Sequence, residues 1–108
     1  MLVNWDRVRV LRDEIGSDDL PEVVAMFLEE GDAVLARLAT PHPPARIEAD
    51  LHTLKGTALT LGFDRLASLC RTGELAARAG QAVDLCALHA VWRDSRSAFE
   101  LGPTSQRV

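Results

Sequence analysis

The sequence predicts an all-α protein, in which an up-down antiparallel four-helix bundle carries a short extra helix at its N-terminus. Apolar residues recur at spacings of three and four in five segments, which is the period of an amphipathic helix. No segment shows the sustained apolar–polar alternation of a half-buried strand. Clusters of glycine and proline separate the segments by short loops, and short loops favour antiparallel neighbours.

The first segment is predicted to run to Ile15 with Asn4 as its N-cap. Its apolar stripe consists of Trp5, Val8, Leu11 and Ile15. The second segment begins near Asp18 or Asp19, because Pro21 is tolerated in a first helical turn. Its apolar line consists of Leu20, Val24, Phe27, Gly31, Val34 and Leu38.

The third segment is predicted over about Pro44–Leu61, with Gly62 as its C-terminal stop. Its apolar line consists of Ile47, Leu51, Leu54, Ala58 and Leu61. The fourth starts with Asp64 as N-cap and the fifth with Asp84, and Pro103 follows the end of the fifth. Their apolar positions are Leu66, Leu69, Cys70, Gly73 and Ala76 or Ala77, then Leu85, Leu88, Val91 or Trp92, and Phe99.

Composition indicates one globular domain over residues 1–103, followed by a frayed polar tail at 104–108. The 108 residues are 47% hydrophobic and carry a formal net charge of -4, which is unlike a nucleic-acid-binding protein. No apolar run approaches the ~20 residues that span a bilayer. The N-terminus has no signal-peptide pattern, and Cys70 and Cys86 are expected to be buried free thiols. We therefore expect a cytoplasmic protein.

The third segment carries an unusual set of residues outside its apolar stripe. At 100° per residue, Glu48, His52, Lys55, Gly56 and Leu59 share a solvent-facing strip. A mid-helix glycine costs about 0.8–1 kcal/mol relative to alanine, so something should require the missing side chain at Gly56. Lys55 is the only lysine in a chain that has eleven arginines.

The run His52-Thr53-Leu54-Lys55-Gly56 with a second glycine at Gly62, followed by Leu66, Cys70 and Glu74, resembles the histidine-containing phosphotransfer (HPt) domain. The resemblance covers the helical hairpin at about residues 47–78, and the five-helix layout extends it along the chain. Two departures stand out. Gly73 replaces the usual leucine and is expected to loosen the fourth helix, and Leu59 is larger than the usual small residue.

The resemblance implies a phosphorelay. His52 would accept a phosphoryl group from a receiver-domain aspartyl phosphate, or from a kinase, and pass it to another receiver aspartate. The partners would be receiver domains of response regulators, a hybrid histidine kinase, or both. Lys55 would offer a positive charge to the phosphoryl oxygens, and Glu74 would hold one ring nitrogen of His52 as N–H. The chain would be a carrier rather than an enzyme. It would bind no cofactor or metal, and Mg²⁺ would come with the receiver.

A docking surface for the partner is expected around His52. Its members would be Gly56, Leu59, Glu48 and Arg78, with apolar residues Trp5, Val8 and Met26 from the first two helices. Gly56 would let the partner approach the helix backbone closely. We expect a monomer with no nucleic-acid or membrane partner.

The same residues are also compatible with an adaptor function and with a metalloprotein function. A helical-bundle adaptor could bind a signalling partner without phosphoryl transfer, with His52 as a bystander. A bundle metalloprotein could use Glu48 and His52, but it would need further inward-facing ligands. A self-sufficient histidine kinase is excluded, because the chain has no glycine-rich ATP-binding segment.

Overall fold

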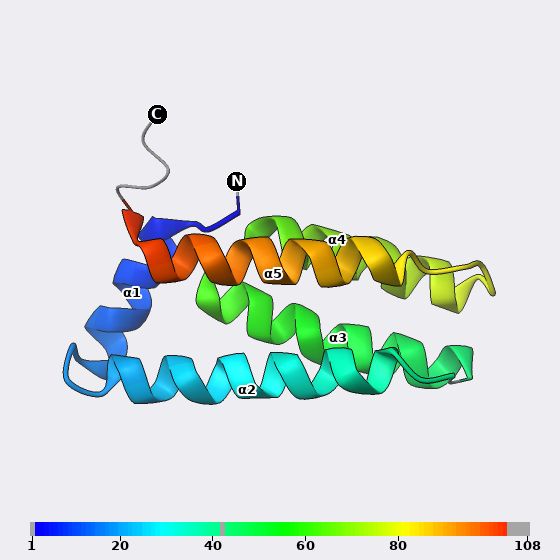
Figure 1. The fold of residues 1–108 in the computed structure, drawn as a ribbon, viewed down its shortest axis with the longest axis horizontal. Coiled ribbons are helices and arrows are strands. Elements are labelled where there is room, and N and C mark those ends of the chain that lie inside the picture. Colours follow the sequence, from blue (N-terminus) through cyan, green and yellow to red (C-terminus); the bar gives the residue numbers. More distant parts are fainter. Residues whose placement is uncertain (1, 42, 104–108) are drawn as a thin grey trace.

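The computed structural model describes residues 2–41 and 43–103. Within these ranges the chain forms helices and no strand, and the helices are α1 (Trp5–Ile15), α2 (Leu20–Leu38), α3 (Pro44–Leu61), α4 (Asp64–Arg78) and α5 (Leu85–Leu101). Helices α2 to α5 run alternately up and down, while α1 crosses one end of the bundle (Figure 1). The predicted fold class is confirmed. The expected tail, residues 104–108, lies outside the described residues.

The turn between α3 and α4 is also where α1 is attached. Gly62 ends α3 in the left-handed conformation at φ 77°, and a Cβ there would lie 2.6 Å from the Asn4 carbonyl oxygen. The Asn4 backbone N–H donates to the Gly62 carbonyl at 2.6 Å, and its side chain caps α1 by accepting from Arg7 N–H at 3.2 Å. Asp64 is the first residue of α4 and Phe63 is its N-cap, so the predicted Asp64 cap is wrong. The Asp64 carboxylate instead accepts from Asn4 Nδ2 at 3.1 Å.

Gly31 explains how α2 and α5 pack. A Cβ at this position would lie only 2.2 Å from the Trp92 ring, so the indole occupies the space that any side chain would need. The indole N–H donates to Asp32 Oδ1 at 2.9 Å, and Arg96 forms an ion pair with Asp32 Oδ2 at 2.5 Å. This carboxylate raises the pKa of the Arg96 guanidinium through its hydrogen bond. The glycine and the adjacent aspartate therefore fix α5 against α2.

Gly73 plays a similar part between α3 and α4, which have the most extensive contact of any helix pair. A Cβ at Gly73 would lie 2.8 Å from Leu51 Cδ1 and 3.2 Å from Val83 Cγ1. The sequence-based expectation that Gly73 loosens α4 is wrong, because the missing side chain lets Leu51 pack directly against the α4 backbone. The glycine tightens the hairpin.

The two cysteines differ in environment. Cys70 is fully buried, and burial, with a smaller contribution from the nearby Glu74 carboxylate, raises the pKa of its thiol to about 12. Cys86 is exposed near the start of α5. The expectation of two buried thiols is therefore correct for Cys70 and wrong for Cys86. Among the described residues, no helix combines the length and apolarity needed to cross a bilayer.

We predict that Gly31→Ala lowers the free energy of unfolding by about 1–3 kcal/mol, since the methyl group would overpack the Trp92 site. Gly56→Ala is the matched control. Its Cβ would meet nothing within 4 Å, so the substitution should add up to about 1 kcal/mol of stability through helix propensity. Urea unfolding followed by circular dichroism measures both. Equal effects in the two variants would contradict the packing described for Gly31.

The thiols supply a second prediction. At pH 8 the native protein should react rapidly with an aromatic disulfide reagent at Cys86 alone, because only thiolates attack disulfides and Cys70 is both buried and protonated. Both thiols should react in denaturant. Cys86→Ser should abolish the fast phase, and rapid native labelling of that variant would show that Cys70 is accessible.

Candidate functional site

His52 lies on the outer face of α3, and 75% of its side chain is exposed. Its neighbour Leu51 and the following Leu54 are fully buried, which fixes the rotation of α3 about its own axis. His52 follows Leu51 by about 100° around the helix, which places it on the side away from the core. The exposed histidine predicted from helix spacing is thus found where it was expected.

Glu74 lies directly behind the histidine ring, on α4. The carboxylate is buried, and its Oε1 lies 3.5 Å from His52 Nδ1, while its Oε2 accepts a hydrogen bond from Lys55 Nζ at 2.9 Å. Oε1 has no hydrogen-bond partner within the part of the chain that the structure describes. Buried carboxylate oxygens normally accept a hydrogen bond, and Oε1 is placed to accept one from an N–H at Nδ1 of the imidazole.

Lys55 contacts Glu74 of α4, which the sequence did not predict. The sequence predicts a positive charge offered to a phosphoryl group, whereas the structure shows the ammonium ion-paired with Glu74, with only 24% of the lysine side chain exposed. Glu48 and Arg78 form a second ion pair across the same two helices, with Glu48 Oε2 3.0 Å from Arg78 Nε. Both residues line a shallow hollow together with His52 and Glu74. The structure therefore brings five of the predicted site residues together.

Gly56 and Leu59 continue this strip along α3. A Cβ at Gly56 would meet nothing within 4 Å, so packing within the described chain gives no reason for a glycine there. Leu59 is 53% exposed, so it adds a large apolar side chain to this face of α3. Both features favour a surface that another molecule covers.

The apolar residues predicted from α1 and α2 are placed differently. Val8 is only 9% exposed and belongs to the core, so its prediction as an exposed docking residue is wrong. Trp5 is half-buried, with its ring stacked on Phe99 at a centroid distance of 5.5 Å. α1 packs at the Gly62 end of α3, about 15 Å along the helix from His52 at 1.5 Å per residue. Met26 on α2 is 63% exposed.

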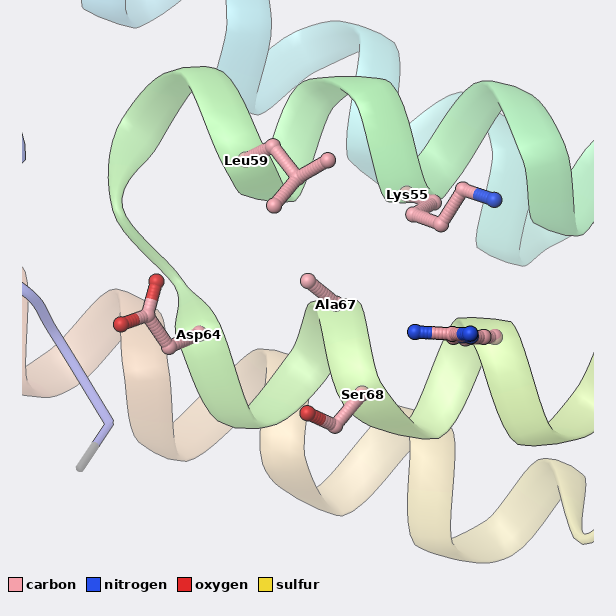
Figure 2. A pocket seen from close by; sticks show the side chains of 6 residues that line it. Lys55, Leu59, Asp64, Ala67 and Ser68 are labelled. Atoms are coloured by element: carbon pink, nitrogen blue, oxygen red, sulfur yellow. The ribbon is translucent and has the colours of Figure 1, made fainter.

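A second hollow, of about 690 Å³, lies between α3 and α4 next to Lys55. Figure 2 shows Leu59 on α3 and Ala67 on α4 pointing toward each other across it, with Ser68 further along α4. Arg71 also lines this hollow and was not singled out from the sequence. Its helical spacing, three residues before Glu74 and seven before Arg78, was the signal that could have revealed it.

The arrangement suits nucleophilic chemistry at the histidine. A carboxylate facing Nδ1 favours the tautomer with the proton on that nitrogen, which leaves the lone pair of the exposed Nε2 free to attack. In the described ranges, no group of three or more histidine, cysteine, aspartate or glutamate side chains could hold a metal ion. The site thus presents an exposed imidazole whose Nδ1 faces a buried carboxylate.

Comparison with protein-family models matches residues 22–100 to the Hpt domain. The match includes all of α3 and α4, and so the whole of the surface around His52. Searches of the curated proteins and of the solved structures gave no significant match.

We predict that Glu74 sets the tautomer of His52. At about pH 8.5, where histidines are neutral, long-range ¹H–¹⁵N spectra should show the proton of His52 on Nδ1 in the wild type. Glu74→Ala should shift His52 toward the Nε2–H form, and Glu74→Gln, which keeps an acceptor oxygen, should restore much of the original form. The exposed His89 on α5 is the internal control. An unchanged His52 tautomer in Glu74→Ala would remove this role.

Proposed function

Because this chain belongs to the Hpt domain family, we propose that it carries a phosphoryl group on His52 in a two-component phosphorelay. Hpt domains are phosphocarrier modules that interact with receiver domains and kinases rather than catalysts in their own right. One observation of this chain supports the assignment to His52. Its ring is largely exposed, while its Nδ1 lies 3.5 Å from the buried Glu74 carboxylate.

The proposed transfer begins with the lone pair of His52 Nε2. It attacks the phosphorus of an aspartyl phosphate on a receiver domain, an N–P bond forms, and the P–O bond to the aspartate breaks with its electron pair on the departing carboxylate. The proton on Nδ1 stays in place, and the positive charge on the phosphorylated ring faces Glu74 Oε1. In the onward transfer, the aspartate of a second receiver attacks the phosphorus, the N–P bond breaks, and its electron pair returns to Nε2.

Lys55 and Gly56 are proposed to serve the same step. The lysine ammonium has three donors, so it can keep its 2.9 Å bond to Glu74 while another N–H faces an incoming phosphoryl oxygen. The open space above Gly56 would let the receiver's active-site rim approach the α3 backbone. Lys55 would thus act on the phosphoryl group, whereas Gly56 would determine how closely the receiver approaches α3.

The partner is proposed to complete the chemistry. A receiver domain would supply the Mg²⁺ and its acidic pocket, and this receiver would belong to a response regulator or to a hybrid histidine kinase. We also propose that this chain acts as a monomer in the cytoplasm. Leu59 at 53% exposure and Met26 at 63% exposure are offered as apolar parts of the contact.

The proposal is tested by phosphoryl transfer from a panel of receiver domains charged with acetyl phosphate. The wild type should acquire an acid-labile, alkali-stable phosphate, and His52→Gln should acquire none. His89→Gln, which alters an exposed histidine on α5, should be labelled like the wild type. Label on His52→Gln would place the phosphate elsewhere. An unlabelled wild type that still binds a receiver would favour the adaptor function.

A further inference from the structure

Charged side chains on α3 and α4 meet in successive pairs along the seam between the two antiparallel helices. At one level Glu48 on α3 pairs with Arg78 on α4 at 3.0 Å. One turn further along, Glu74 on α4 faces His52 at 3.5 Å and Lys55 at 2.9 Å on α3. At both levels, each arginine or lysine has a carboxylate partner within this chain.

Arg71 lies one turn further along the seam, and it has no carboxylate partner among the described residues. It lies one helical turn before Glu74 on α4 and lines a hollow together with Lys55 and Leu59 of α3, neither of which is an anion. Asp64, at the start of α4, lines the same hollow, and its carboxylate accepts a hydrogen bond from Asn4 Nδ2. Within the described residues, no carboxylate lies within ion-pair distance of the Arg71 guanidinium. Arg71 therefore contributes an uncompensated positive charge beside the site of a chain whose net charge is -4.

The position of Arg71 indicates what the charge would contact. The hollow that contains Arg71 is lined by Lys55 but not by His52, whereas the hollow around His52 is lined by Arg78 but not by Arg71. Lys55 thus stands between Arg71 and the imidazole. A guanidinium so placed is suited to the rim of a docked partner rather than to the phosphoryl group itself.

We propose that Arg71 is a specificity-determining residue of the docking surface and binds a carboxylate at the acidic rim of the receiver's phosphoacceptor pocket. This inference rests on the proposed function. A pocket that holds Mg²⁺ beside an aspartate must be rich in carboxylates, and the planar guanidinium fork matches a carboxylate with two parallel hydrogen bonds. Leu59 and Ala67, which point toward each other across the hollow, supply an apolar wall beside Arg71 (Figure 2).

A rim contact of this kind should affect association more than chemistry. Charges at the edge of an interface change the association rate and its salt dependence. We therefore expect Arg71→Gln to raise the KM for phosphorylated receiver about fivefold at low salt, and Arg71→Glu to raise it further, with kcat unchanged. The difference from the wild type should shrink as the salt concentration increases.

The experiment follows single-turnover transfer from one phosphorylated receiver at two salt concentrations. The rate constant at saturating receiver serves as kcat, and the half-saturating receiver concentration serves as KM. Arg65→Gln is the matched control, because Arg65 is an exposed arginine of the same helix, has no ion-pair partner among the described residues and does not line the hollow. It should behave like the wild type. A charge-reversed receiver, with lysine in place of a rim carboxylate, should bind Arg71→Glu better than it binds the wild type.

The possible outcomes separate this inference from the function on which it rests. If the wild type accepts no phosphate on His52 from any receiver, the proposed function fails and the Arg71 assignment fails with it. If the wild type is phosphorylated but Arg71→Gln matches Arg65→Gln, only the Arg71 assignment is overturned. A loss of kcat at unchanged KM would also overturn it, because the guanidinium would then act on the phosphoryl group.

Discussion

The close packing of α4 against α3 is the constraint on which the site depends. Leu51 reaches the α4 backbone because residue 73 has no side chain, and this contact sets both the distance and the register of the two helices. The next residue on α4 is Glu74, and Leu51 is followed on α3 by His52. Shifting either helix by one residue would turn the carboxylate away from the imidazole by about 100°.

The two ion pairs across this hairpin differ in physical character. Glu74 is buried, so removing Lys55 would leave a carboxylate with little solvent to stabilise it, and the pair is hard to separate. The Glu48–Arg78 pair is exposed on the arginine side, and exposed pairs contribute only about 0–1 kcal/mol. A docking protein could therefore displace Arg78 at small cost while the Glu74–Lys55 pair keeps its geometry. The site combines a fixed interior with an adaptable edge.

The spacing of apolar residues was sufficient to predict the helical fold and the residues of the exposed strip on α3. The rotation of α3 follows from its buried leucines, so His52, Gly56 and Leu59 could be placed outside without a structure. Contacts between helices could not be derived in this way. The stripe of α1 shows which residues are apolar, but only the packed structure shows that Val8 is covered. The tight approach at Gly73 was missed for the same reason, since a glycine in a sequence does not reveal what fills its space.

The core of this protein includes residues of α1 and of the segment before it, which precede the match to the family model. The family match starts at residue 22, yet Val3 is fully buried and Leu11 is 4% exposed in the same core as the hairpin leucines. A chain starting at the matched border would lose these side chains and the Asn4 N–H that satisfies the Gly62 carbonyl. The turn leading into α4 would then be open to water. In this protein the buried core therefore extends beyond the residues that match the family model, and α1 supports the hairpin at its Gly62 turn, about 15 Å along α3 from His52.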